Sequence, residues 1–445
     1  MHFIITGKLE KSGNQKVLII TYYWPPSGGS PVLRWLNFAK NLPDYGWEPV
    51  IYTPENPSPQ EYDDDLRNEI PPGIIVLKTK IWEPYSFYNL LLGQKRKDSI
   101  PTAFLSGEKG KSLLKRLGNF IRSNWFIPDA RKFWINPSIK NLSLWLQDNP
   151  VDLLLTSGPP HSMHIIGLGL KKKYNLPWIA DFRDPWTKID YYKELLLTKK
   201  ANKKHHTLEM KVLTSADAVI TVSPTMSKEF LHMGAKKVYT LTNGFAAQYM
   251  QEDKFNYQKF SLMHVGSIAA SRNAEILWEV LRKLVNEDKE FEKYLEIQLI
   301  GKTDHTVTQS LEKNNLTNYV KHTGFIPNSQ VVEKASEAAI LLLLINNTHN
   351  AKGILTNKFF DYLAARRPIL AIGPVDGDAA EIIKETQAGE ICDFHDSNTL
   401  TAILKKYFTY FIEKKLMVKS LNVEKYSRKN ITETLVDIFH STIID

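Results

Sequence analysis

The sequence predicts an α/β protein with two Rossmann-like domains that face each other across a cleft. Short apolar runs alternate with helical patterns along both halves of the chain, which is typical of parallel sheets covered by helices. Each half also opens with a strand that ends in a loop containing glycine, at residues 16–30 and 260–273. Finally, 445 residues exceed one ordinary core, and two domains of about 200 residues are the natural division.

The composition is that of a globular protein. Hydrophobic residues make up 43% and charged residues 24% of the chain, which excludes a disordered protein. The single cysteine, Cys392, excludes an internal disulfide and suits a reducing cytosol. Three consecutive acids at 63–65 cannot all face one ion from a regular element, so no metal site is expected there. Residues 1–15 lack a signal-peptide pattern and no segment approaches the roughly 20 apolar residues of a membrane span, so we expect a cytoplasmic protein.

The excess positive charge is concentrated in one segment. The formal net charge is +9, and residues 93–132 hold ten Lys or Arg against three acidic residues. Within this segment, residues 111–126 place apolar side chains at helical spacing with Lys and Arg between them. Such a helix could rest on the inner face of an anionic membrane or pack on its own domain with a solvated basic face, and both alternatives stay open. Nucleic acid is not expected as a partner, because no nucleic-acid-binding module accompanies the single basic segment.

The first strand is predicted at residues 16–22, and a loop with paired glycines, Gly28 and Gly29, follows it. Glycines let a backbone approach a ligand closely, although a tight turn would need them equally. Ser30 and Pro31 predict the start of a helix, as its N-cap and its first-turn proline. The loop lacks the G-x-G-x-x-G pattern, so it does not indicate a dinucleotide cofactor.

Two later strand ends of the first half carry residues that suit a cleft. The predicted strand at 152–156 ends in Ser-Gly-Pro-Pro-His-Ser, which presents His161 either to a substrate or as a cap of the next helix. The following strand ends in Asp-Phe-Arg-Asp-Pro-Trp, where Asp181 and Asp184 flank Arg183. Charges at a buried strand end are costly unless they are paired, so this segment indicates either an internal ion-pair lock or a sugar-binding site.

The second half opens with a strand that is predicted to end at Gly266. Arg272 and Asn273 then precede a helix at 274–286. A guanidinium can bind two phosphate oxygens at once, so Arg272 suits a phosphate site, with a free surface arginine as the alternative. Phe325 lies in a Gly-Phe-Ile-Pro turn after a later strand.

The helix predicted at 357–365 is the centre of the expected site. It follows a buried strand and a loop, and a second buried strand follows it, all within residues 338–372. Lys358, Asp361 and Tyr362 share one face of this helix. A lysine can neutralise phosphate and a carboxylate can accept hydrogen bonds from a ribose diol, so this face could bind a nucleotide by its phosphates and its sugar. A solvated surface Lys–Asp pair is the alternative.

The segment Asn-Lys-Phe-Phe-Asp-Tyr-Leu-Ala-Ala-Arg-Arg-Pro-Ile-Leu-Ala-Ile-Gly, at 357–373, resembles the motif of retaining GT-B glycosyltransferases of family 4. Asp361 matches the second glutamate of the family's two-glutamate motif, which binds the donor ribose. The first glutamate would fall on Gly353, so the sequence departs from the family at the contact to the donor sugar hydroxyls.

The resemblance also implies roles for the loops described above. The glycine loop of the first half would approach the donor phosphates and the acceptor, the loop before the helix at 274–286 would bind the donor phosphates, and the Gly-Phe-Ile-Pro turn would contact the nucleobase. The segments around His161 and Arg183 resemble the acceptor-side pattern of one branch of the family. The predicted donor-binding residues are Gly28, Gly29, Gly266, Arg272, Asn273, Phe325, Lys358, Asp361 and Tyr362. The predicted catalytic residues are His161, Arg183, Asp184, Arg272 and Lys358.

The expected activity is transfer of a sugar from a nucleotide diphosphate-sugar to a hydroxyl of a glycan or lipid-linked acceptor, of the surface-polysaccharide type. The resemblance implies retention of configuration and no metal or other cofactor. The expected domains are 1–244 on the acceptor side and 260–420 on the donor side, with a C-terminal helix in 421–445 that returns to the first domain. Two alternatives stay open: a nucleotide-sugar epimerase of the same fold, and a non-catalytic nucleotide-sugar-binding partner of a polysaccharide assembly complex, which Gly353 would suit.

Overall fold

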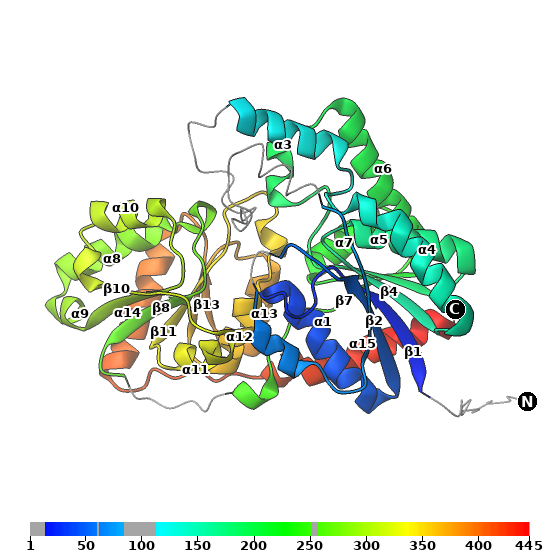
Figure 1. The fold of residues 1–445 in the computed structure, drawn as a ribbon. Helices are drawn as coiled ribbons and strands as arrows, with labels where there is room; N and C mark the ends of the chain where they lie inside the picture. Colours follow the sequence, from blue (N-terminus) through cyan, green and yellow to red (C-terminus); the bar gives the residue numbers. More distant parts are fainter. Residues whose placement is uncertain (1–13, 60–61, 84–112, 251–256, 445) are drawn as a thin grey trace, which may run out of the picture.

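The computed structural model describes residues 14–59, 62–83, 113–250 and 257–444, which form two parallel β-sheets flanked by helices (Figure 1). The first sheet has seven strands in the order β3-β2-β1-β4-β5-β6-β7, and the second has six in the order β10-β9-β8-β11-β12-β13. The predicted α/β fold with two Rossmann-like domains is confirmed. The strands of the first sheet are β1 Gln15–Ile20, β2 Trp47–Pro54, β3 Ile75–Thr79, β4 Leu153–Gly158, β5 Trp178–Phe182, β6 Ala218–Thr221 and β7 Val238–Thr240. The strands of the second sheet are β8 Phe260–Val265, β9 Leu295–Ile300, β10 Val320–Thr323, β11 Ile340–Leu344, β12 Ile369–Ile372 and β13 Gly389–Cys392.

The helices connect consecutive strands and cover the sheets. The helices that precede β8 are α1 Ser30–Asn41, α3 Leu113–Trp125, α4 Lys132–Asp148, α5 Ser162–Tyr174, α6 Lys199–Ser215 and α7 Pro224–His232. The helices that follow β8 are α8 Glu275–Glu287, α9 Lys289–Tyr294, α10 His305–Lys313, α11 Val331–Ser336, α12 Asn357–Ala365, α13 Asp378–Thr386, α14 Ser397–Ile412 and α15 Arg428–Ile444.

In both sheets the chain order reverses beside the first strand. β1 pairs with β2 on one side and β4 on the other, and β8 likewise pairs with β9 and β11. Where neighbouring strands send their loops in opposite directions, a crevice forms at the carboxyl ends. This topology places the loops after β1, β4, β8 and β11 where a ligand would bind.

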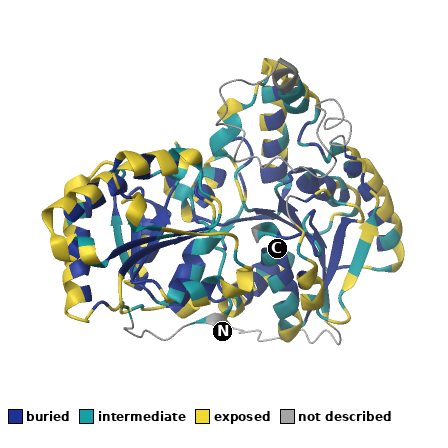
Figure 2. Cartoon of the chain, turned by 60° about the vertical axis from the view of Figure 1, so that its left-hand side comes forward, coloured by how far each residue is buried: buried dark blue, intermediate teal, exposed yellow. Residues whose placement is uncertain are grey.

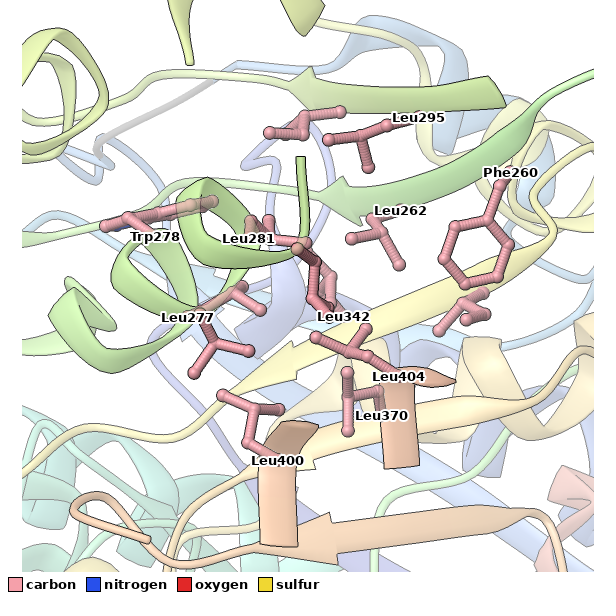
Figure 3. Packing of buried hydrophobic residues seen from close by; sticks show 14 of the residues in the cluster. Phe260, Leu262, Leu277, Trp278, Leu281, Leu295, Leu342, Leu370, Leu400 and Leu404 are labelled. Atoms are coloured by element: carbon pink, nitrogen blue, oxygen red, sulfur yellow. The ribbon is translucent and has the colours of Figure 1, made fainter. Parts of the chain in front are cut away.

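Alternate residues of each strand pack against helices on opposite faces. In the second domain, Leu262 and Leu342 join the cluster that contains Trp278 of α8, whereas Met263 and Leu343 join the cluster on the α12 face. Figure 3 shows the first of these clusters. Because both faces are covered, the central strands are buried, whereas the outer faces of the helices and parts of the edge strands and loops are exposed (Figure 2). This double burial explains the near-continuous apolar runs of the strands.

The C-terminal helix returns to the first domain, as predicted. Leu435 and Phe439 of α15 belong to the same buried cluster as Val17 of β1. The ring of Phe439 lies 4.9 Å from that of Trp47 at an edge-to-face angle. Figure 1 shows α15, in red, lying along the first domain.

Two details of the predicted elements need correction. α1 begins at Ser30 itself, and its N-cap is Gly29, with a φ of 83°, rather than Ser30. β3 is also missing from the predicted elements, although residues 74–77 are all apolar; it lies at the sheet edge and its side chains are partly exposed. Of the basic segment, residues 93–112 lie outside the described residues, and the predicted amphipathic helix is α3.

A buried ion pair lies at the centre of the first domain. Asp181, at the carboxyl end of β5, is fully buried and accepts hydrogen bonds from Nη2 of Arg34 at 3.0 Å, Nε1 of Trp35 at 2.9 Å and Oγ of Ser157 at 2.9 Å. The ion-pair lock predicted for the Asp-Phe-Arg-Asp segment is therefore present. Its cation, however, is Arg34 and not the adjacent Arg183.

We expect Arg34→Met to lower the free energy of unfolding of the first domain by about 3–5 kcal/mol, because it leaves the Asp181 carboxylate buried without its counter-ion. Urea denaturation followed by tryptophan fluorescence measures the change. Asp64→Asn is the control, since it breaks an exposed ion pair with Arg67 at 3.0 Å and should cost less than about 1 kcal/mol. Equal effects of the two substitutions would contradict a structural role for the buried pair.

Candidate active site

The carboxyl end of β8 is the centre of the candidate site. Gly266 follows this strand with a φ of 100°, a conformation that favours glycine. A Cβ atom at this position would lie 3.2 Å from Nζ of Lys358, so the glycine also lets a lysine of α12 approach the strand end. The structure thus brings together two of the predicted donor-binding residues.

A buried histidine holds Lys358. Its Nζ lies 2.9 Å from Nε2 of His264, and Nδ1 of His264 lies 3.0 Å from the carbonyl oxygen of Leu342. Because a carbonyl only accepts, Nδ1 carries the proton and Nε2 accepts a hydrogen bond from the lysine. Desolvation and the charge of Lys358 hold the pKa of His264 well below its usual value, so the ring is neutral.

Arg272 supplies a second cation near Lys358. Its guanidinium donates to Oδ1 of Asn346 at 2.7 Å and to the carbonyl of Ser267 at 3.3 Å, and both acceptors are neutral. Desolvation holds the pKa of Lys358 well below its usual value, the charge of Arg272 lowers it further, and Asp361 opposes them. Within the described residues, neither cation has a carboxylate at ion-pair distance. Arg272 therefore carries a positive charge that the described side chains do not neutralise, and Lys358 adds a second charge when a bound anion restores its proton.

The other two predicted residues of α12 have different surroundings. Asp361 is half-buried, and desolvation raises the pKa of its carboxyl to about 6 against the opposing effects of Arg428 and Lys358. Tyr362 is fully buried, and its hydroxyl accepts a hydrogen bond from the backbone N–H of Val265 at 2.9 Å. Tyr362 therefore fixes the end of β8, and its contact with the donor stays a prediction.

The side chain of Asn273 is also occupied within its own domain. Its Oδ1 accepts a hydrogen bond from Nε1 of Trp278 at 2.9 Å, and its Nδ2 donates to Oγ of Ser310 at 2.8 Å. These bonds tie the start of α8 to α10. The amide thereby positions the loop that carries Arg272, and its contact with the donor stays a prediction.

The remaining predicted donor residues lie in loops at the strand ends. Phe325 is 82% exposed in the turn after β10, which leaves its ring available for stacking. Gly28 and Gly29 follow β1, and Gly29 has a left-handed φ of 83° where α1 begins.

His161 and its neighbours surround the loop that follows β4. The ring of His161 stacks in parallel on Trp186 with centroids 4.6 Å apart, and Nδ1 of His164 lies 2.9 Å from Oγ1 of Thr156. Among the described residues, His161 Nδ1, His164 Nε2 and Arg183 Nε have no hydrogen-bond partner. Burial lowers the pKa of His161, and it lowers that of His164 to about 3, so both rings are neutral. Buried polar atoms without partners are unusual and suit a place that a ligand or water completes.

Arg183 and Asp184 differ in their contacts. The guanidinium of Arg183 donates to the carbonyl of Pro159 and lies 5.7 Å from the ring centre of Tyr23. The side chain of Asp184 is exposed, although the surrounding protein raises the pKa of its carboxyl by desolvation and the charge of Arg183 opposes this. Asp184 is thus open to a ligand, whereas Arg183 is held against the loop after β4.

Sequence reasoning missed the residues that hold these loops. Glu209 of α6 is buried and accepts hydrogen bonds from the backbone N–H groups of Trp186 at 3.3 Å and Thr187 at 3.2 Å. Asn346, after β11, holds Arg272. A glutamate within a charged helix and an asparagine within a loop give no signal in sequence, because their function depends on distant partners.

The two domains contact each other beside the site. Thr225, in the first turn of α7, donates to Asp378 of α13 from its backbone N–H at 3.0 Å and from its hydroxyl at 2.8 Å. Gly353 ends the short helix η9 Ala351–Gly353, and a Cβ atom there would lie 3.3 Å from Oγ of Ser223 and from Cβ of Thr225. The position of the family's first glutamate therefore lies against the first domain.

Comparison with known proteins supports the fold and the family resemblance. Residues 33–248 match the sequence profile of Glycosyltransferase Family 4, and the fold matches sucrose-phosphate synthase from Thermosynechococcus elongatus with a TM-score of 0.63, 12% identity and coverage of 96% of this chain and 99% of that chain. The protein has the GT-B fold and resembles the family 4 glycosyltransferases. TarM from S. aureus, in complex with fondaparinux, alpha-GlcNAc-glycerol and UDP, gives a TM-score of 0.59 at 10% identity, covering 96% and 99% of the two chains. WaaG, a glycosyltransferase involved in lipopolysaccharide biosynthesis, gives 0.54 at 12% identity, covering 95% and 99%.

No curated protein sequence matches the chain significantly. The GT-B structures are at most 12% identical to this chain, so their similarity shows the fold alone. The family match together with this fold supports glycosyl transfer as the class of activity. In the described part of the chain, no helix is both long and apolar enough to cross a membrane. The same residues contain no group of three or more His, Cys, Asp or Glu side chains placed to hold a metal ion.

We expect binding of inorganic diphosphate to be coupled to proton uptake by Lys358. The pKa of the free lysine is depressed, and a bound anion raises it, so affinity should increase as the pH falls through the range between the two values. Titration calorimetry at pH 8 in two buffers of different ionisation enthalpy measures the uptake. Lys358→Met should abolish it, whereas Lys405→Met, on the exposed side of α14, should not. Identical heats in both buffers for the unmodified protein would contradict the coupling.

Proposed function

We propose that the protein transfers a sugar from a nucleotide diphosphate-sugar to an acceptor hydroxyl, with retention of configuration and without a metal ion. The observation that carries the proposal is the pair of cations, Arg272 and Lys358, at the strand end marked by Gly266. Both are desolvated, and their described hydrogen-bond partners are neutral. Such a site suits a ligand that brings two or more negative charges, as a nucleotide diphosphate does.

The chemical demand of the reaction is stabilisation of the charge that develops on the departing diphosphate. Arg272 and Lys358 are placed for this role, and each donor contributes about 2–4 kcal/mol of transition-state stabilisation in comparable sites. In this assignment Asp361 accepts hydrogen bonds from the ribose hydroxyls and Phe325 stacks on the nucleobase. Gly28 and Gly29 let the first domain approach the donor phosphates.

The acceptor side is formed by the loops after β4 and β5. The unpaired ring nitrogen of His161 and the open carboxylate of Asp184 position the sugar and the acceptor hydroxyl, and Arg183 holds the loop between them. The acceptor attacks from the face on which the diphosphate leaves, and a leaving phosphate oxygen takes its proton. This route requires no carboxylate nucleophile, and the bond to the anomeric carbon forms as the bond to the diphosphate breaks.

The proposal includes the division of the chain into an acceptor-side domain at 1–244, a donor-side domain at 260–420 and a returning segment at 421–445. It also includes a cytoplasmic location and an acceptor that is a glycan or a lipid-linked molecule used in polysaccharide biosynthesis. Gly353 supports a second candidate, a nucleotide-sugar-binding protein without turnover, because this position lacks the family's glutamate.

The protein also rests on the inner face of a membrane in this proposal, through the segment 93–132. Support comes from the aromatic surface, which we define as the exposed apolar residues Trp82, Phe120, Ile121, Trp125 and Phe133. Trp125 is 69% exposed, and Nζ of Lys132 lies 4.9 Å from the ring centre of Phe133. Aromatic side chains interleaved with cations are what an interfacial helix presents to anionic lipid.

We expect Arg272→Ala and Lys358→Ala each to lower kcat by about 10²–10³-fold, because each removes a donor to the leaving diphosphate. Turnover is measured across a panel of acceptors by release of UDP, GDP or ADP from the corresponding diphosphate-sugars, and by release of CMP from CMP-sugars. Arg282→Ala, an exposed arginine of α8, is the matched control and should leave kcat unchanged.

Turnover of either variant within a few fold of the unmodified protein would refute the assignment. Donor binding without turnover across the whole acceptor panel would favour the non-catalytic candidate. Consumption of a donor without any acceptor, with formation of an epimeric sugar, would favour an epimerase.

We expect Trp125→Ser to weaken binding to vesicles of phosphatidylglycerol by about tenfold, since it removes one large side chain from the interface. Sedimentation of the protein with vesicles measures the affinity. Leu144→Ser is the control, because Leu144 is 57% exposed on α4 and is not part of the aromatic surface. Loss of binding in both variants, or in neither, would contradict this surface as the membrane contact.

A further inference from the structure

A cavity lined by residues of both domains lies near the candidate active site. It has a volume of about 680 Å³ and is lined mainly by residues 187–206 of the first domain, with Glu229 of α7 and the loop residues His349 and Asn350 of the second domain. The volume is in the range of sites that bind small organic molecules. Because residues of both domains line it, the cavity lies where their strand-end loops meet.

The cavity is adjacent to the cations of the proposed donor site. Its lining begins at Thr187, directly after the loop that holds Asp184, and it includes His349, three residues after the Asn346 that binds Arg272. Asp190, between the lining residues Ile189 and Tyr192, is close enough to Arg272 for its charge to raise the pKa of the guanidinium. A molecule in this cavity would therefore lie next to a donor bound at Arg272.

The lining combines apolar walls with an excess of cations. Ile189 and Leu195 are among the apolar residues, and the lysines are Lys188, Lys193 and Lys199. The only acidic residue among the lining residues, Glu229, already pairs with Lys188 at 3.4 Å. In the described part of the chain, Lys193 and Lys199 form no ion pair. The free positive charge of the lining thus lies on these two lysines.

A helix end adds to the positive potential. α6 has 17 residues, and its first turn, from Thr198 to Asn202, lines the cavity. The hydroxyl of Thr198 accepts from the N–H of Ala201 at 3.2 Å and so caps one of the free N–H groups of this turn. The other N–H groups and the helix dipole favour an anion at this end.

The wall of the cavity is attached to the helix of the aromatic surface. Nδ2 of Asn124, on α3, donates to the carbonyl of Leu196 at 2.7 Å, and its Oδ1 accepts from the N–H of Thr198 at 2.7 Å. The segment that carries Leu195 and Lys199 therefore packs directly on α3, and Figure 1 shows α3 and α6 side by side. A ligand of the cavity can thus be presented from solution or from a membrane beneath α3.

We propose that this cavity binds the acceptor and that the acceptor is phosphorylated, with Lys193, Lys199 and the α6 N-terminus binding its phosphate and the apolar walls binding the adjoining group. A phosphate presents several oxygens to cations and N–H groups at once, which suits this arrangement better than a single carboxylate. The role as acceptor rests on the proposed function, whereas binding of a phosphate ester does not.

The test uses the full chain with octyl phosphate and, as its uncharged counterpart, octyl glucoside, with binding followed by tryptophan fluorescence. We expect octyl phosphate to bind at least about tenfold more tightly, and the double variant Lys193→Glu/Lys199→Glu to lose that preference. Lys211→Glu is the control for a single substitution, because it makes the same charge change as Lys199→Glu alone but on α6 about 18 Å from Lys199. The variant Lys193→Gln/Lys199→Gln, which removes charge without adding any, should weaken binding in the same direction.

Further arms separate the possible sources of the phosphate and the two proposals. Phenyl phosphate tests a soluble ligand, and phosphatidic acid vesicles test a lipid. If the double variant loses phenyl phosphate binding but keeps vesicle binding, the cavity is assigned to soluble ligands. Equal binding of octyl phosphate and octyl glucoside, or unchanged binding in the double variant, would overturn the inference. Binding of UDP to both forms shows that the donor site is intact, so failure of UDP binding counts against the proposed function and leaves the cavity result valid.

Discussion

The site depends on one electrostatic constraint: two partly buried basic side chains lie near each other, and no carboxylate of the described residues pairs with either. Lys358 and Arg272 are each kept in place by neutral acceptors, His264 and Asn346, which orient the charge without cancelling it. Such an arrangement destabilises the empty protein, because desolvation and mutual repulsion both disfavour the charged lysine. A bound anion would offset both effects. The residues His264, Asn346 and Gly266 of the second domain hold the two basic side chains in place for it.

The same constraint explains the returning C-terminal helix. Arg428 begins α15, donates to the carbonyl of Gly244 at 3.2 Å and lowers the pKa of Asp361 against its desolvation. The pKa of Asp361, in the second domain, therefore depends on a residue of the helix that packs on the first domain. Three residues before Gly244, the carbonyl of Leu241 accepts a hydrogen bond from Arg34 at 3.0 Å, and Arg34 also pairs with Asp181. The segment 241–244 is thus bound by Arg428, whose charge acts on Asp361, and by Arg34, which pairs with Asp181 in the core of the first domain.

Much of the fold follows from sequence, because double burial makes strands apolar and strand ends carry glycine. Residues 357–365 are helical as predicted, and Gly266 and Lys358 meet as their loop positions imply. The orientation of Tyr362 does not follow from helical spacing: its face of α12 is shared with Lys358, but contact with β8 buries the phenol. Nor can spacing reveal that Asp181 pairs with a cation 147 residues away in the sequence. The structure confirms what local pattern encodes and corrects what depends on tertiary contacts.

Gly353, where the family has its first glutamate, lies at the contact between the two domains. A side chain at this position would enter the contact with Ser223 and Thr225, and Asp378 strengthens that contact through two hydrogen bonds to Thr225. The glycine therefore permits a close approach of the domains that a glutamate would oppose by its size and charge. In the proposed function, position 353 supplies no carboxylate to the donor sugar, and polar groups of the first domain would contact its hydroxyls. The unpaired nitrogen of His161 and the open carboxylate of Asp184, at the ends of β4 and β5, are the first-domain groups assigned to this contact in the proposed function.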